Sequence, residues 1–127
     1  MKQPVDLARR FLAMAERDIK AFQKLSEDPE IDDEIVGFHA QQAVEKCLKA
    51  ILSLHQVPFR RTHHLDELVD LLKDQNKPLP PDVEPLEVLN PFAIRLRDDF
   101  AESGALDRRQ ARRIIEAVQR WTLEQIR

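Results

Sequence analysis

The stretch from residue 38 to residue 52 constrains the fold of this chain most, because a helix would sort its side chains onto two opposite sides. At 100° per residue, the small and apolar residues gather on one side. They are Ala40, Ala43, Val44, Cys47, Leu48 and Ile51. The other side is a band about 100° wide, in which Phe38 lies beside four polar residues. These four, here called the polar row, are Gln41, Gln42, Glu45 and Lys49. The apolar side must pack on a core, whereas the polar row can face water or contact something polar.

The first two thirds of the chain show apolar residues at three- and four-residue steps, which is typical of amphipathic helices and not of strands. We expect a first helix that follows Pro4, a second over about residues 34–55 and a third over about residues 64–74. Pro58 should end the second helix, because proline lacks an amide donor. The apolar residues of the first helix are Leu7, Phe11, Met14, Ala15, Phe22 and Leu25.

Two more helical segments are expected in the last third of the chain. Asp82 can cap one of them, with Pro85 inside its first turn, where a missing donor costs nothing. Pro91 should then break this segment. The last helix should begin at Asp107, which can form a capping box with Gln110 three residues later.

Length and composition fit one domain over residues 1–127 and exclude several functional classes. Five helical pieces with short links predict an all-α, antiparallel bundle. The lone cysteine, Cys47, excludes a disulfide within the chain and fits a reducing compartment. No apolar run approaches the ~20 residues that span a bilayer, so we expect a cytoplasmic protein with no membrane partner. The net charge of −3 argues against generic nucleic-acid binding, and two glycines leave no glycine-rich phosphate loop.

A basic turn over residues 60–64 precedes the third helix. Its two arginines and two histidines could bind a phosphate together with the free amides of the helix N-terminus. Alternatively, Thr62 or a histidine caps the helix and the arginines are solvated. Adjacent histidines point apart and no third ligand has helical spacing to either, so we expect no metal site.

Two arginine clusters lie further along the chain. The first places Arg95 and Arg97 beside two aspartates, which could bind phosphate or a metal-bridged nucleotide, or form ion pairs of little energy. The second consists of four arginines over residues 108–113, where cations oppose the dipole of the helix that begins there. Such a departure often marks a functional surface, here for an acidic partner or a phosphate backbone. The alternative is pairing with the acidic loop over residues 27–34.

The polar row allows two interpretations. Glu45 and Lys49 are four residues apart and can form an ion pair on a solvated surface. Two adjacent glutamines beside Phe38 are nevertheless unusual on a surface that only faces water. They suit a partly buried contact with a bound ligand or with a second copy across a symmetric dimer seam.

Four segments of the chain resemble the HEPN family (higher eukaryotes and prokaryotes nucleotide-binding). The most specific is Phe-x-x-Gln-Gln-Ala-x-Glu-Lys-x-Leu-Lys-Ala over residues 38–50. In the order of the family, Ala-x-x-Asp-Ile over residues 15–19 precedes it. Thr-His-His-Leu over residues 62–65 and a segment over residues 90–99 follow it. Together the four segments extend the resemblance from about residue 7 to about residue 121.

The resemblance implies a four-helix up-and-down bundle with a short extra helix, usually dimeric. Small stand-alone members are thought to pair with a minimal nucleotidyltransferase encoded nearby, in a toxin–antitoxin-like or nucleotide-handling role. The positions that match family motifs are Gln41, Gln42, Glu45, Lys49, His63 and Arg97. Arg95 joins them from its place in the basic cluster, and we expect these seven residues to bind a nucleotide or phosphate.

The chain departs from the family in two places. The ribonuclease branch has an arginine, four to six intervening residues and then a histidine, a spacing that none of the four histidines here shows. Cleavage of RNA needs a base and an electrostatic stabiliser together. The absence of this arginine–histidine spacing therefore argues against ribonuclease activity. Asp98 and Asp99 also replace the usual Tyr-Pro, which removes an aromatic surface for a base.

The sequence therefore predicts a non-catalytic HEPN-type bundle that forms a homodimer, holds no metal or cofactor, and serves as the binding partner of a nucleotidyltransferase. That role would include nucleotide or RNA binding. One alternative is a ribonuclease toxin whose site forms at a dimer interface, with His63 or His64 as the base. Another is an interaction scaffold with no small ligand.

Overall fold

The computed structural model describes residues 3–81, 84–93 and 104–127. In these residues the chain forms four α-helices and one 3-10 helix, and it forms no strand. They are α1 (Pro4–Ser26), α2 (Asp33–Leu54), α3 (Leu65–Asp74), η1 (Leu86–Phe92) and α4 (Arg108–Ile126). The all-α bundle with a short extra helix is thus confirmed. The predicted cap Asp82 and the cluster over residues 95–99 lie outside the described residues.

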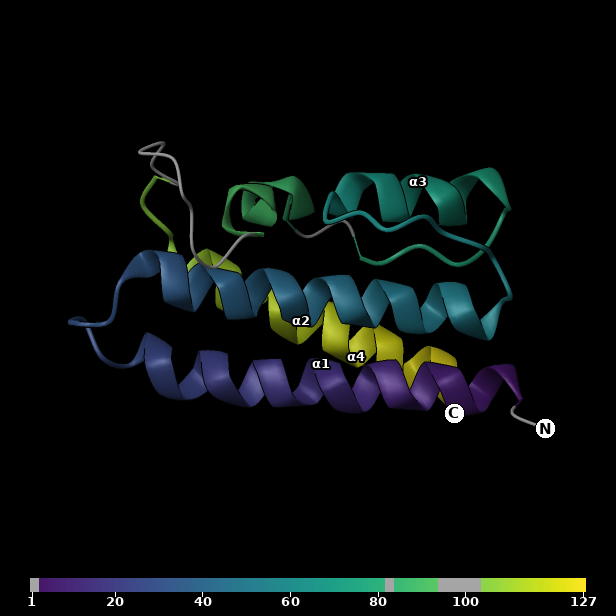
Figure 1. Ribbon diagram of the computed structural model, residues 1–127, viewed down its shortest axis with the longest axis horizontal. Helices are drawn as coiled ribbons and strands as arrows, with labels where there is room; N and C mark the ends of the chain where they lie inside the picture. The colour runs from purple at the N-terminus through teal and green to yellow at the C-terminus, as the bar shows by residue number, and fades with distance from the viewer. Residues whose placement is uncertain (1–2, 82–83, 94–103) are drawn as a thin grey trace.

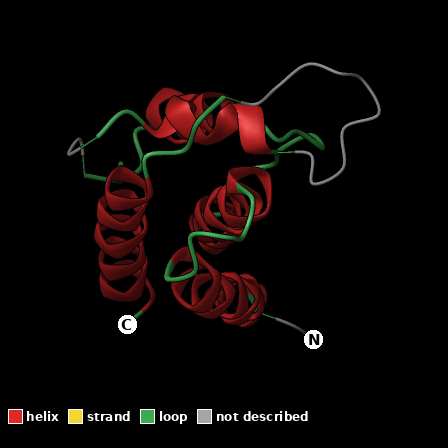
Figure 2. Cartoon of the chain, turned by 90° about the vertical axis from the view of Figure 1, so that its left-hand side faces the viewer, coloured by secondary structure: helices red, strands yellow, loops and turns green. Residues whose placement is uncertain are grey.

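Helix α2 lies at the centre of the bundle and contacts each of the other four helices. In Figure 1, α1 runs antiparallel beside it, α4 lies behind, and α3 and η1 lie above. The end-on view in Figure 2 shows the helix that carries the C-terminus standing apart from the helix that follows the N-terminus. The apolar side of α2 forms the core, because all six residues expected there are buried. That prediction is confirmed.

Helices α2 and α3 end in the same way. The residue after each C-cap, Gln56 or Asn76, adopts a positive φ of 56° or 55°. In α2, the amide of Val57 donates to the carbonyl of Leu52, which satisfies one of the last free carbonyls of the helix. A proline follows two residues after each of the two turns, at positions 58 and 78. Local backbone geometry therefore ends α2 just before the proline from which its end was predicted.

The apolar residues of α1 divide between two faces of the helix. The face that packs into the core consists of Ala8, Leu12, Ala15, Ile19 and Phe22. Leu7 and Met14 belong to another face, where each is 42% exposed. The sequence identified these residues as apolar but could not tell which face α2 would cover.

Helix η1 corrects two predictions. Pro85 is its N-cap and does not lie within the first turn, and the helix continues through Pro91 to Phe92 as a 3-10 helix. Phe92 is buried against Gly37 of α2, where a Cβ atom would clash with its ring. This packing holds the chain in a tight helical turn beyond the proline.

The start of α4 is capped as predicted, but only from one side. Asp107 accepts hydrogen bonds from the amides of Arg109 and Gln110 at 3.1 and 3.0 Å. The Gln110 side chain does not return to the cap, because it donates to Glu84 at 3.2 Å. The reciprocal half of the capping box was therefore a wrong prediction, and Gln110 instead ties α4 to the segment before η1.

Candidate functional site

The polar row of α2 is folded into the protein and does not form a solvated face. Gln41 is fully buried and Glu45 is 3% exposed, whereas Gln42 and Lys49 are partly buried at the edge. The backbone carbonyl of His63 accepts a hydrogen bond from Gln41 Nε2 at 3.0 Å, so the basic turn lies over this part of α2. Of the two interpretations, the solvated surface is wrong, and the contact observed is internal.

The Glu45 carboxylate is the centre of a hydrogen-bonded cluster. Its Oε1 atom accepts from Gln41 Nε2 at 3.0 Å and lies 2.9 Å from His63 Nδ1. Its Oε2 atom accepts from Lys49 Nζ at 2.9 Å. Burial alone would raise the pKa of Glu45, but the three hydrogen bonds and the charge of Lys49 together lower it below its ordinary value. Glu45 is therefore an ionised carboxylate with a structural role.

The ionised carboxylate also determines the tautomer of His63. A carboxylate can only accept hydrogen bonds, so Nδ1 of His63 must carry the proton. In the neutral ring, Nε2 then holds a lone pair, and the side chain is 50% exposed. In the protonated ring, Nε2 becomes a second donor. His63 can thus present either an acceptor or a donor to solvent.

Gln42 and Lys49 complete the outer edge of the cluster. Gln42 Nε2 donates to Gln41 Oε1 at 2.7 Å. Lys49 Nζ lies 5.7 Å from the ring centroid of Phe59, within reach of a cation–π contact. The sequence reasoning missed Phe59, which follows Pro58 in a segment with no helical periodicity. Five of the seven predicted residues are therefore brought together, and the other two, Arg95 and Arg97, lie outside the described residues.

A second polar cluster joins α1 to α2. Asp18 accepts from Lys46 Nζ at 2.6 Å and lies 3.0 Å from His39 Nδ1. The spacing of His39 and Lys46, two helical turns apart, was a signal that both face the same neighbour. These contacts link α1 to α2 through one shared carboxylate.

One amide at the N-terminus of α3, where the sequence suggested a phosphate site, already has a partner within the protein. The amide of Leu65 donates to Asn90 Oδ1 at 2.9 Å, and Asn90 Nδ2 donates to Asp66. Of the two predicted caps, His64 holds the N-cap position, although its side chain makes no capping hydrogen bond, and Thr62 accepts from the amide of His64 outside the helix. Asn90 comes from η1, 25 residues away, and no local pattern could have identified it. The basic turn and Asn90 line a cavity of about 370 Å³.

The four arginines at the start of α4 have different roles. Arg108 donates to the carbonyls of Ser26, Asp28 and Ile31 and to the carboxylate of Asp33. Arg113 pairs with Glu84 at 2.8 Å. The side chains of the other two arginines of this cluster make no hydrogen bond or ion pair within the described ranges. Pairing with the acidic loop is therefore confirmed for Arg108, where it closes the α1–α2 turn onto α4.

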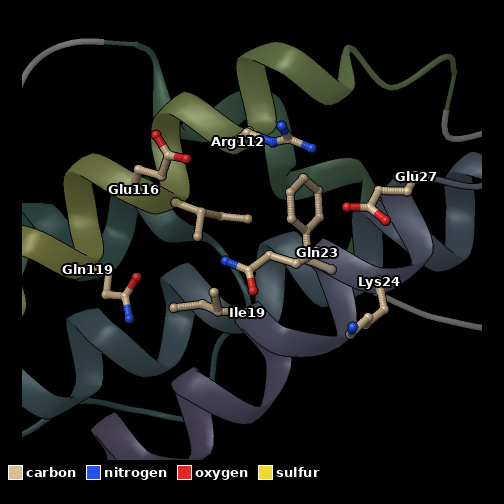
Figure 3. A pocket seen from close by; sticks show the side chains of 9 residues that line it. Ile19, Gln23, Lys24, Glu27, Arg112, Glu116 and Gln119 are labelled. Atoms are coloured by element: carbon tan, nitrogen blue, oxygen red, sulfur yellow. The ribbon is translucent and has the colours of Figure 1, made fainter.

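A groove of about 310 Å³ separates α1 from α4. Its floor is apolar and includes Phe22 and Ile115, whereas Figure 3 shows polar side chains along both rims. They are Gln23, Lys24, Glu27, Arg112, Glu116 and Gln119. Both signs of charge line this groove, so its electrostatics select no particular occupant.

The described residues contain no cluster of histidine, cysteine or acidic side chains suited to a metal. In the same part of the chain, none of the helices has the length and apolar character needed to cross a bilayer. No curated protein and no solved structure gives a match to the chain. The family model of the HEPN domain matches residues 8–122, which is nearly the whole chain. This match agrees with the helical bundle, and the chain belongs to the HEPN domain family.

Proposed function

We propose that this chain is a non-catalytic HEPN bundle that serves as the binding partner of a minimal nucleotidyltransferase. In this proposal, a nucleotide or RNA phosphate contacts Gln42, Lys49 and His63. The observation that supports the binding part most is the buried Glu45 carboxylate. It holds Lys49 and His63 on its two oxygens, 2.9 Å from each, and so places two cationic or hydrogen-bonding groups side by side at the surface.

The chemistry of these outer groups suits a phosphate. A lysine ammonium acts as a point charge with three donors, of which Glu45 takes one. A protonated His63 adds a donor at Nε2. Gln41 and Glu45 are positioning residues in this scheme, because their polar atoms are already engaged with one another and with the basic turn. Arg97 stays in the proposal through the motif resemblance, and Arg95 through its place in the basic cluster of the sequence.

The proposed homodimer and the nucleotidyltransferase partner derive from the family resemblance. Both are tested by measuring molar mass with light scattering, first for the chain alone and then after mixing with a minimal nucleotidyltransferase. A mass equal to the sum of the two proteins supports the partnership. A chain that elutes unchanged from the mixture contradicts it.

Calorimetric titration tests the ligand. ATP, GTP and short single-stranded RNA are added at low salt to the intact protein and to the variants Lys49→Gln and His63→Ala. We expect each variant to weaken binding about tenfold, the size of one lost charge-assisted contact. Lys73→Gln, on the exposed end of α3, is the matched control and should bind as the original protein does. Absence of heat beyond dilution at millimolar ligand would remove the ligand from the proposal.

One observation favours a second function, the dimeric ribonuclease. A carboxylate that holds Nδ1 of a histidine leaves Nε2 as a base, which is the arrangement used in hydrolytic triads. Here Glu45 holds His63 in this way, and Arg61 lines the same cavity as His63. Incubation with labelled single-stranded RNA decides between the functions. Cleavage that His63→Ala abolishes and the neighbouring His64→Ala retains would make the chain an enzyme.

A further inference from the structure

Helix α1 carries an apolar stripe beside its core face, of which Phe11 packs partly on the core and the other two residues are exposed. Leu7, Phe11 and Met14 lie at positions i, i+4 and i+7, which places them within about 60° of one another around the helix. Leu7 and Met14 are each 42% exposed, and Phe11 is partly buried. Single exposed apolar residues are ordinary on a protein surface, whereas an aligned row of them marks an interaction surface.

Two residues of this stripe, Leu7 and Phe11, form part of one wall of an open groove of about 900 Å³, which Met14 does not line. Leu7 and Phe11 line it from α1, and the segment Val57 to Phe59 lines it from the turn after α2. The rings of Phe11 and Phe59 meet edge to face, with centroids 6.3 Å apart. The floor is therefore aromatic and apolar, and its size suits the side chains of a helix better than one small ring.

The charges around the groove have one sign. Among the described residues that line it, Arg10 is the only charged one, and it makes no ion pair with a described residue. Lys49 lies near the Phe59 ring, but its charge is paired with the Glu45 carboxylate and adds no net charge to the groove. This groove thus differs from the one between α1 and α4, where charges of both signs occur.

We propose that this groove docks an amphipathic helix of a partner protein, with apolar residues at i and i+4 and carboxylates that face Arg10. The positive charge favours such a segment over a second copy of this chain. A twofold axis through the groove would bring Arg10 close to the same residue of the second copy, where like charges repel. The inference concerns a surface next to the polar row and does not depend on phosphate binding there.

Fluorescence anisotropy tests the proposal with two synthetic helical peptides. Both carry leucines at i, i+4 and i+7, and they differ only in having glutamate or lysine at the flanking positions. The glutamate peptide should bind the intact protein about tenfold more tightly than the lysine peptide, as expected for one favourable charge contact. Arg10→Glu should reverse this order. Arg9→Glu, the adjacent exposed arginine that does not line the groove, should leave it unchanged.

The apolar contact is tested with Leu7→Asp, which should weaken the glutamate peptide about tenfold or more, since it places a charge in an apolar contact. Leu123→Asp, at an exposed leucine of α4, is the control and should have no effect. Circular dichroism checks that each variant is folded. Equal binding of both peptides, no binding of either, or insensitivity to Leu7→Asp overturns the proposal.

Sedimentation equilibrium tests whether a second copy of this chain, and not a partner helix, occupies the groove. A dimer of the intact protein that Leu7→Asp dissociates would assign the groove to a second copy and overturn the proposal. The titration with ATP separates this inference from the proposed function, because Arg10→Glu should leave nucleotide binding at the polar row intact. Loss of peptide binding alone therefore contradicts only the docking surface.

Discussion

His63 Nδ1 lies 2.9 Å from Glu45 Oε1, although the two residues are 18 positions apart in the chain. This contact fastens the basic turn onto α2. It also determines which nitrogen of His63 faces solvent. Without this contact, the polar row would be a helical face with one ion pair. With it, the Glu45 carboxylate is buried and contacts three donor groups.

Replacement of Glu45 by glutamine should destabilise the protein by about 2 kcal/mol, because the mostly buried Lys49 and the half-exposed His63 lose their common acceptor. The cost is at the low end for a buried pair, since His63 is half-exposed and can return to water. Urea unfolding at pH 7 measures it. Glu67→Gln removes an exposed carboxylate paired with Arg60 and should cost less than about 0.5 kcal/mol. Equal losses in the two variants would contradict the central role of Glu45.

The same carboxylate predicts a loss of stability in acid. Its pKa in the folded protein is below the ordinary value of 4.5, so the unfolded chain binds the proton more tightly. The stabilisation is fully present above pH 4.5 and is lost as the pH falls through the lower, folded pKa. Urea midpoints measured from pH 7 to pH 3 should converge for the original protein and Glu45→Gln as acid is added. A constant difference over the whole range would show that Glu45 is not the titrating group.

The architecture could be predicted from the sequence because periodicity is a local property. The apolar side of α2 follows from spacing alone, and the buried Cys47 and Ile51 bear it out. Spacing alone could not predict which face of α1 is buried. Leu7 and Met14 have the same apolar character as Leu12, and only the position of α2 decides which of them is covered.

The candidate site could be predicted only in part for the same reason. Helical spacing placed Lys49 beside Glu45, since residues four apart are neighbours. The partners His63 and Asn90 come from 18 and 25 residues away along the chain, and no propensity encodes such contacts. The resemblance to a family motif marked His63 as a site residue. Its geometry against Glu45 required the folded bundle.

Gly37→Ala tests the packing of η1 on α2. Alanine favours a helix by about 1 kcal/mol over glycine, but its Cβ would clash with the buried ring of Phe92. Overpacking of this kind costs about 1–3 kcal/mol, so we expect a net loss of about 1 kcal/mol in urea unfolding. In a Phe92→Leu background the same substitution should cost less, because the ring is gone. The same cost in both backgrounds would show that Phe92 is not the obstacle.

Cys47 should report on opening of the bundle. Burial is the main cause that raises the pKa of its thiol to about 12. A hydrogen bond with Thr122 lowers this pKa in part, and the negative charge of Glu16 raises it further. Only the thiolate reacts with a disulfide reagent, so the folded protein should be almost inert at pH 8. Adding urea should raise the labelling rate in proportion to the unfolded fraction, because the thiol reacts only when α2 separates from α4. A control chain with an added surface cysteine, Lys73→Cys, should react at once without urea. Rapid modification of Cys47 in the native protein would mean that the core around α2 opens far more easily than its burial indicates.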